Sequence, residues 1–138
     1  MGIVEKLLRK FSRRFIYERK APRRRAANLP TRFRLRWGGR ASEYVEAHTR
    51  DLSASGIAIE TASIRVDGLH VYDSPDMVTP MRLDIVLGLP SGDVTIVGET
   101  VRYDAIEDGG YLLGVRIVEI SDADRSRYDT FVATLQRR

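Results

Sequence analysis

Three residues with a fixed spacing could bind a polar ligand. Asp51, Ser53 and Gly56 form the pattern Asp-x-Ser-x-x-Gly. A carboxylate accepts hydrogen bonds, a hydroxyl can also donate one, and glycine permits a positive φ or a close approach of the backbone. The same residues could form an Asx-type turn, with the two side chains bonding nearby amides and Gly56 closing the turn. The pattern thus predicts either a ligand site or a capped turn.

An arginine-dense stretch lies upstream of this motif and includes Arg19, Arg23 and Arg24. Residues 1–40 hold fourteen basic residues, eleven of them arginine, against two acids. Guanidinium is a planar fork that can bind phosphate or a guanine edge through two hydrogen bonds, whereas ammonium acts as a point charge. The stretch therefore predicts an anionic partner: a nucleic acid, a nucleotide, an anionic lipid or an acidic protein surface.

Composition limits the remaining classes. The 138 residues suit one domain with an appendage, and residues 1–40 carry a net charge of +12 against −8 for residues 41–138. There is no cysteine, which excludes disulfides and thiolate metal sites. No apolar run approaches the roughly 18 to 20 residues of a membrane-spanning helix. We therefore expect a cytoplasmic protein with no transmembrane segment and no metal.

The sequence contains little that resembles a catalytic motif. Asp73 and Asp76 flank Ser-Pro, a spacing more typical of a capped turn than of an acid/base pair. His48 alternates within an expected strand, which favours a surface or half-buried residue over a ligand. Nucleophile motifs, phosphate-binding glycine loops and helix-borne metal pairs are absent from the sequence. We expect a protein that is not an enzyme and uses no cofactor.

Alternating apolar and polar residues predict an all-β dominated fold. Phe33, Leu35 and Trp37 point one way and the intervening arginines the other, with a Gly-Gly turn following. Because the strands have no helices between them, we expect a six- or seven-stranded antiparallel β-barrel. Residues 61–80 look like an irregular excursion with a short strand near 69–72. The expected strands are residues 31–37, 43–50, 56–60, 81–87, 93–103 and 110–120.

Two helices are expected at the ends of the chain. An apolar stripe at helical spacing predicts an N-terminal amphipathic helix over residues 1–17, which would pack on its own barrel or on a second copy. Residues 18–30 form an arginine-rich linker arm, too polar to bury itself. Ser121 is the expected N-cap of a C-terminal helix that closes the barrel and ends near Arg137 and Arg138. Residues 31–138 make up the barrel domain with this helix.

Asp-x-Ser-x-x-Gly before a strand, downstream of an Arg-x-x-x-Arg arm, resembles the PilZ family of cyclic di-GMP receptors. Further family-like features are Gly-Val-Arg-Ile at residues 114–117 and Arg125 near the start of the closing helix. The resemblance covers residue 18 to about residue 136. Arg19 and Arg23 satisfy the arm spacing, with Pro22 before the second arginine. A frame shifted by one residue would place Arg24 second and break the motif.

The resemblance implies binding of cyclic di-GMP, a bacterial second messenger with two guanines and two phosphates. Arginine forks at Arg19 and Arg23 would meet guanine O6 and N7 or phosphate, and Arg24 would add a phosphate contact. Asp51 would accept from the N1 and N2 donors of guanine. Ser53 would donate to phosphate or base, and Gly56 would permit close approach of the ligand. We expect these six residues to form the site.

Binding would order the arm and change the surface offered to a protein partner, with a homodimer as one candidate assembly. A different class of function is a sequence-nonspecific nucleic-acid-binding protein that uses the basic N-terminal segment. The −8 body favours the first interpretation, because it would repel a long polyanion but tolerate a compact dianion.

Overall fold

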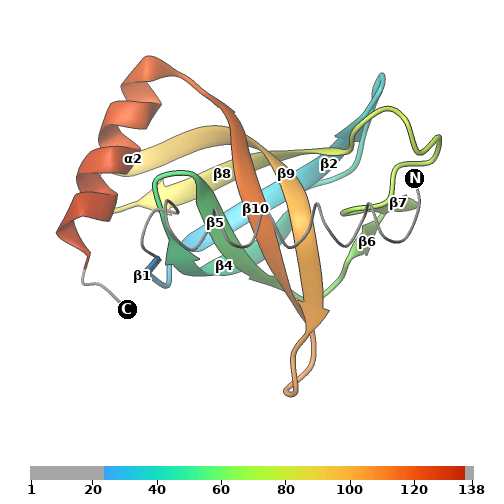
Figure 1. Ribbon diagram of the computed structural model, residues 1–138, viewed down its shortest axis with the longest axis horizontal. Coiled ribbons are helices and arrows are strands. Elements are labelled where there is room, and N and C mark those ends of the chain that lie inside the picture. Colours follow the sequence, from blue (N-terminus) through green and yellow to red (C-terminus); the bar gives the residue numbers. More distant parts are fainter. Residues whose placement is uncertain (1–23, 136–138) are drawn as a thin grey trace, which may run out of the picture.

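A computed structural model describes residues 24–135 of the chain (Figure 1). The expected N-terminal helix, Arg19 and Arg23 lie outside these residues. The elements of the described part, in chain order, are β1 Arg25–Ala26, β2 Pro30–Trp37, β3 Arg40–Ala41, β4 Val45–Leu52, β5 Gly56–Thr61, β6 Arg65–Val66, β7 Leu69–His70, β8 Arg82–Leu89, β9 Gly92–Ala105, β10 Tyr111–Ile120 and α2 Asp122–Thr134.

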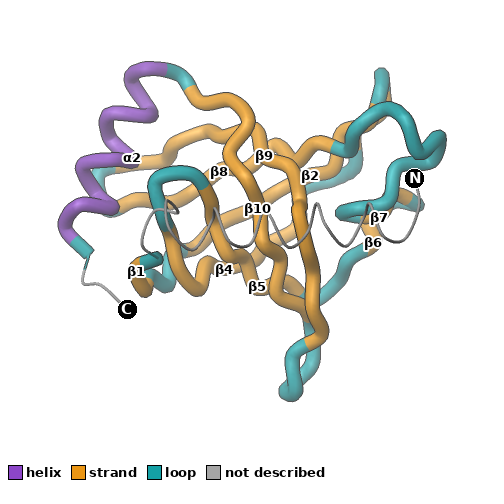
Figure 2. The backbone as a smooth tube through the Cα atoms, viewed as in Figure 1, coloured by secondary structure: helices purple, strands orange, loops and turns teal. Residues whose placement is uncertain are grey.

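Six long strands close into an antiparallel barrel, which confirms the expected fold. They follow the order β4, β5, β10, β9, β8 and β2, and β2 pairs back with β4. The short strands β1 and β3 extend the sheet beside β4 and β2, and β6 and β7 form a separate two-stranded sheet. Figure 2 shows the long strands wrapping around a common interior, with the longest loops at the end opposite α2.

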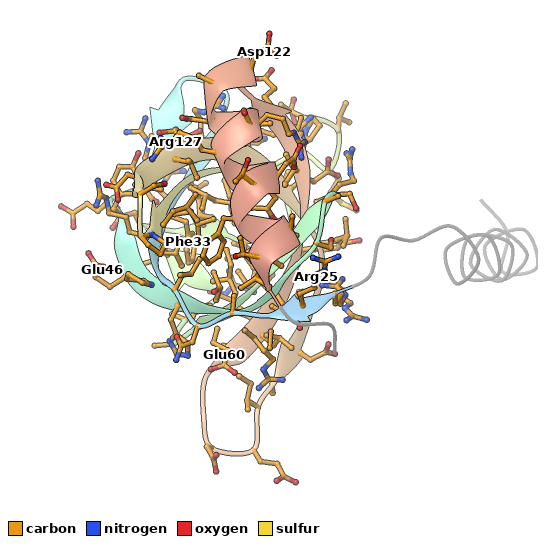
Figure 3. The ribbon with its side chains drawn as sticks, turned by 90° about the vertical axis from the view of Figure 1, so that its left-hand side faces the viewer. Arg25, Phe33, Glu46, Glu60, Asp122 and Arg127 are labelled. Carbon is orange, nitrogen blue, oxygen red and sulfur yellow. The ribbon has the colours of Figure 1, made fainter. Side chains whose placement is uncertain are left out.

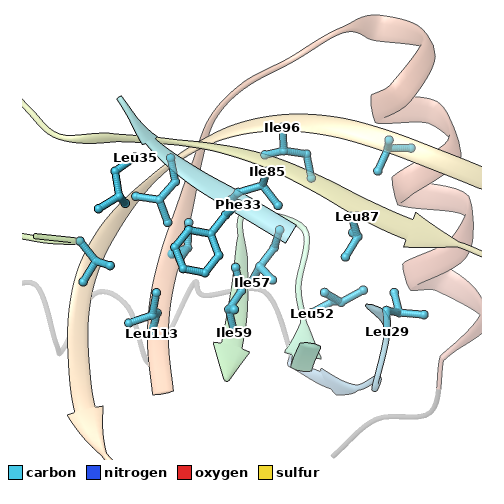
Figure 4. Close-up of a cluster of buried hydrophobic side chains, with 14 of the residues drawn as sticks. Leu29, Phe33, Leu35, Leu52, Ile57, Ile59, Ile85, Leu87, Ile96 and Leu113 are labelled. Atoms are coloured by element: carbon cyan, nitrogen blue, oxygen red, sulfur yellow. The ribbon is translucent and has the colours of Figure 1, made fainter. Parts of the chain in front are cut away.

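The apolar residues of the alternating pattern fill the interior of the barrel. Phe33 and Leu35 of β2 are fully buried, while Arg34 and Arg36 lie on the outer face and bond Asp84 of β8. Removing an apolar side chain of this size from water stabilises the folded state by roughly 1.5 to 3 kcal/mol. Figure 4 shows the apolar side chains that fill the barrel, among them Leu29, Phe33, Leu35, Leu52, Ile57, Ile59, Ile85, Leu87, Ile96 and Leu113.

Helix α2 covers one end of the barrel, as Figure 3 shows looking onto the helix. The Oγ of Ser121 accepts from the amide of Asp124 at 3.2 Å, so the predicted N-cap is confirmed. Tyr128 and Val132 are buried against the barrel. The helix ends at Thr134, so the expected basic last turn was wrong, and residues 137 and 138 lie outside the described part.

The excursion closes the opposite end of the barrel (Figure 1). Val66, Leu69 and Val71 are buried in the same core as the strands, and the expected short strand is β7. Asp76 caps the turn that follows: its Oδ1 accepts from the amides of Val78 at 2.9 Å and Thr79 at 2.8 Å. These bonds lower the pKa of Asp76 to about 2. The prediction of a capped turn is confirmed here.

The end of the arginine-rich arm belongs to the barrel. β1 pairs with β4, Arg25 opposite Leu52 and Ala26 opposite Asp51. Farther along the arm, the hydroxyl of Thr49 donates to the carbonyl of Ala27 at 2.6 Å and accepts from the amide of Leu29 at 2.9 Å. The predicted arm ran to residue 30, yet residues 24–30 lie along the barrel. Their backbone finds hydrogen-bond partners on β4, which composition alone does not reveal.

Candidate functional site

The loop between β4 and β5 is a tight turn closed by its own residues. The amide of Ser53 donates to the carbonyl of Gly56 at 2.9 Å, and the amide of Gly56 donates to the Oγ of Ser53 at 3.1 Å. Ser53 is 1% exposed. The hydroxyl therefore caps the turn, which is one of the two structures that the sequence predicted for this motif.

Gly56 is required by its neighbour in the sheet. It does not have a positive φ, and a Cβ atom there would lie 2.9 Å from the carbonyl oxygen of Val115 on β10. Real Cβ atoms almost never approach an oxygen this closely. Of the two uses of glycine foreseen from the sequence, close backbone approach is the one observed, and the approaching group is strand β10.

Helix α2 holds the same turn from the other side. The hydroxyl of Tyr128 donates to the carbonyl of Ser53 at 2.7 Å, and Nη1 of Arg125 donates to the carbonyl of Ala54 at 2.8 Å. Burial raises the pKa of Tyr128 well above its ordinary value. The turn is thus fixed to the helix that closes the barrel. The rule that a buried tyrosine hydroxyl needs an acceptor could have pointed to this contact from the sequence.

Asp51 lies on the outer face of β4, at the start of this turn. It pairs with Ala58 across the sheet, whereas the neighbouring pair of Thr49 and Ile59 faces the core. Oδ1 of Asp51 accepts from Nη1 of Arg24 at 2.9 Å, and the side chain of Asp51 is 7% exposed. The structure therefore brings an almost buried carboxylate and an arginine of the arm together on the outside of the barrel.

Of the six predicted site residues, the structure brings four together. Arg24 and Asp51 form an ion pair, and Ser53 and Gly56 form the adjoining turn. Arg19 and Arg23 lie outside the described residues, although Arg24 marks where their segment meets the barrel. The ion pair was not foreseen, because the sequence assigned Arg24 to phosphate alone.

Arg25 is a residue that the sequence analysis missed. Its Nη1 donates to the carbonyl of Val132 at 2.8 Å and to that of Leu135 at 3.5 Å, at the C-terminal end of α2 (Figure 3). A cation at this end of a helix meets carbonyls that lack partners within the helix, and the negative end of its dipole. The arm thus supplies the basic group that the last turn of α2 lacks.

His48 is a strand residue, as predicted. It lies half exposed on β4, with Nε2 2.6 Å from Oε2 of Glu60 on β5, and Arg50 donates to the same carboxylate through Nε at 2.9 Å. Partial burial opposes ionisation of Glu60, but the bonds from Arg50 and His48 outweigh it and lower the pKa of Glu60. The cluster is a cross-strand surface network.

Residues 24–135 hold no group of three or more histidine or acidic side chains placed to share a metal ion. Among the same residues, no helix has both the length and the apolar character needed to cross a membrane.

Comparison with known proteins identifies a family. The PilZ domain matches residues 17–134. No curated protein matches the sequence. Among solved structures, the Bacillus subtilis inhibitor of motility MotI/DgrA is 18% identical with a TM-score of 0.60, and the match covers 83% of this chain and 49% of that one.

Two further structures share the fold. The PilZ domain of YcgR from Escherichia coli, solved with c-di-GMP, is 13% identical with a TM-score of 0.57, covering 85% of this chain and 91% of that one. MrkH from K. pneumonia, a c-di-GMP-dependent transcription regulatory factor, is 16% identical with a TM-score of 0.53, covering 80% and 48%. This chain spans about half the length of MotI/DgrA and of MrkH.

Proposed function

Because the chain belongs to the PilZ domain family, we propose that it is a receptor for cyclic di-GMP that regulates a protein partner. Its role is binding rather than catalysis. The observation that carries the proposal is the placement of Asp51: a carboxylate held on the outer face of the barrel, beside the point where the arginine arm joins it. The PilZ domain of YcgR, which shares this fold, was solved with c-di-GMP.

In this proposal Asp51 reads guanine. The Watson–Crick edge of guanine presents the N1 and N2 donors, and an ionised carboxylate offers acceptors only. The Asp51 carboxylate is already held by Arg24 at 2.9 Å, which fixes its orientation. A guanine that donates to Asp51 meets a group that is oriented before binding, which reduces the entropic cost of association.

Arg19 and Arg23 provide the remaining charge for a dianionic ligand. Each guanidinium can fork onto guanine O6 and N7 or bind a phosphate, and both residues precede Arg24 by only a few positions. Arg24 then contributes from the base of the arm. If the frame is shifted by one residue, the second arginine of the motif is Arg24 itself.

Ser53 and Gly56 take part chiefly by shaping the site. The Oγ of Ser53 accepts from the Gly56 amide, and Gly56 allows β5 to lie against β10. Together they fix the turn that begins at Asp51. A direct bond from Ser53 to the ligand would require its hydroxyl to leave the turn.

The output of binding is a changed surface around the arm and α2. Arg24 bonds Asp51 in the candidate site, and its neighbour Arg25 bonds the carbonyl of Val132 at the end of α2. A nucleotide that alters the position of Arg24 therefore acts on a residue adjacent to the helix contact. We propose that a protein partner reads this surface.

The rival function, nonspecific binding of nucleic acid, has less support. Residues 24–135 contain thirteen arginines and no lysine against seventeen acids, so the barrel is net acidic. An acidic body repels a long polyanion that lies across it, whereas a dinucleotide touches the site alone. Duplex binding would also weaken steeply with salt because many counterions are released, and dinucleotide binding would weaken little.

Isothermal titration of the full chain with cyclic di-GMP and cyclic di-AMP tests the proposal. Cyclic di-GMP should bind and cyclic di-AMP should not, because adenine places a lone pair at N1 opposite the Asp51 carboxylate. Asp51→Asn should weaken cyclic di-GMP binding, and duplex DNA serves as the control for the rival function. Equal binding of both dinucleotides would refute the guanine-reading role of Asp51.

A further inference from the structure

A single row of paired residues crosses four strands on the outer face of the barrel. Asp51 of β4 pairs with Ala58 of β5, Ala58 pairs with Gly114 of β10, and Gly114 pairs with Arg102 of β9. Directly paired residues of antiparallel strands project from the same face of a sheet. The row therefore has a carboxylate at one end, a guanidinium at the other, and only alanine and glycine between them.

Both charged ends of the row owe their orientation to a β-bulge. On β4 the register shifts between Thr49 and Asp51, and on β9 it shifts between Thr100 and Arg102, opposite Val115 and Gly114. Thr49 and Thr100 are buried toward the core. Strict alternation would turn the residue two positions later inward as well. Each bulge adds one residue and so turns a charged side chain onto the outer face.

Gly114 leaves room for the side chain of Arg102. Around the point where a Cβ of Gly114 would stand, Cγ of Arg102 lies at 3.0 Å, Nε at 3.2 Å and Cδ at 3.6 Å. Gly114 does not have a positive φ, so its backbone does not demand glycine. A glycine inside a strand often marks a place where another group approaches closely, and here that group is Arg102 lying down across β10.

The guanidinium of Arg102 is exposed and makes no hydrogen bond or ion pair with any residue of the described part. Its neighbours on the same face differ, since Arg82 and Arg116 both bond Glu99 at 3.0 Å and 2.7 Å. Arg102 is thus a cation with unused donors, placed by a bulge and given space by a glycine.

We infer that Arg102 is a further nucleotide-contacting residue, which meets the Hoogsteen edge of the guanine that Asp51 reads. This inference rests on the proposed function. Three interstrand steps separate the two residues, or roughly 14 Å between their backbones. A guanine that gives its N1 and N2 donors to Asp51 keeps N7 and a lone pair of O6 on the adjacent Hoogsteen edge, outside that contact. The planar fork of Arg102 can donate to that edge with two hydrogen bonds.

Titration of the full chain with cyclic di-GMP tests this role. Arg102→Ala should raise Kd by roughly tenfold to a hundredfold, the range for a lost bidentate contact to guanine. Arg102→Lys should restore only part of the affinity, because an ammonium keeps the charge but not the fork. The matched control is Arg65→Ala, which removes an exposed arginine outside the row whose side chain makes no bond in the described part. It should change Kd less than twofold.

Gly114→Ala provides a second, independent perturbation. Its Cβ would press on the flexible stem of Arg102 and lift the side chain off β10. We expect weaker binding with an unchanged thermal midpoint. Adding Arg102→Ala to Gly114→Ala should cost less than it does in the natural chain, because both changes act on one contact.

The failures can be told apart. No binding of cyclic di-GMP by the unaltered chain would refute the proposed function itself. Binding by the unaltered chain together with an unchanged Kd in Arg102→Ala would overturn only the role of Arg102. Full affinity in Arg102→Lys would overturn the fork contact with guanine.

Discussion

Replacing Tyr128 with phenylalanine removes one oxygen that fixes the candidate site to helix α2. The hydroxyl donates to the carbonyl of Ser53 at 2.7 Å and lies 3.3 Å from that of Gly56. The carbonyl of Gly56 keeps the bond from the Ser53 amide, but the carbonyl of Ser53 loses its partner inside the protein. A buried acceptor left without a partner costs about 1 to 2 kcal/mol. For a domain of this size, the thermal midpoint should fall by roughly 3 to 8 °C.

Thermal and urea unfolding followed by circular dichroism measure this loss. The matched control is Tyr111→Phe, which removes a hydroxyl that makes no hydrogen bond in residues 24–135. Affinity for cyclic di-GMP should also fall in Tyr128→Phe, because the turn that begins at Asp51 becomes less fixed. If Tyr128→Phe unfolds at the same temperature as Tyr111→Phe, the hydroxyl does not stabilise the turn and our reasoning is wrong.

Alkaline pH provides a second readout for Tyr128. Desolvation raises the pKa of its phenol above the ordinary value of 10.0, so the folded state holds the proton more tightly than the unfolded state does. The free energy of unfolding should therefore fall as pH rises above about 10, where the unfolded phenol ionises. This contribution should be missing from Tyr128→Phe and retained in the control.

Three further predictions concern the arm, the turn and the excursion. Arg19→Ala and Arg23→Ala should each raise the Kd for cyclic di-GMP roughly tenfold to a hundredfold by titration, with little change in thermal midpoint. A raised Kd in Arg24→Ala together with an unchanged Kd in Arg19→Ala would instead indicate that the motif is shifted by one residue. Gly56→Ala should lower the free energy of urea unfolding by about 1 to 3 kcal/mol, because its Cβ would stand 2.9 Å from the backbone of β10, and equal stability would contradict that packing argument. Burial lowers the pKa of His70 below its ordinary 6.5, so the unfolded chain takes up the proton first. The free energy of unfolding should therefore fall as pH drops from 6.5 to the folded pKa. His70→Asn should lack this loss, and the same pH dependence of stability in both proteins would refute the prediction.

Local patterns in the sequence account for much of the barrel. Phe33 and Leu35 alternate with arginines, and the structure buries the apolar set, because a strand with one face on a core must alternate in this way. Ser121 followed by acids predicted the start of α2 correctly. Both features depend on neighbours within a few positions, which is why they can be read along the chain.

Features that depend on distant partners were not predicted. Alternation from Thr49 would have placed Asp51 inside the barrel, and only the register with β5 reveals the bulge that turns it outward. Arg24 looked like part of a free arm because its partner Asp51 lies far along the chain. Residues 61–80 looked irregular, and no local pattern indicated that Leu69 fills the end of the barrel.

The pairing of β1 with β4 limits how far along the arm a conformational change can extend. β2 and β4 are paired only between Pro30–Phe33 and Val45–His48, and beyond His48 the two strands part. There β1 pairs with β4 instead, so the arm itself supplies the strand that continues the sheet at this point. A rearrangement of the arm beyond Arg24 would separate β1 from β4 and leave the backbone amides of β4 free to pair with another chain. In the proposed function, cyclic di-GMP can therefore shift the side chain of Arg24 at low cost, whereas a shift of the backbone from Arg25 onward would break the pairing of β1 with β4.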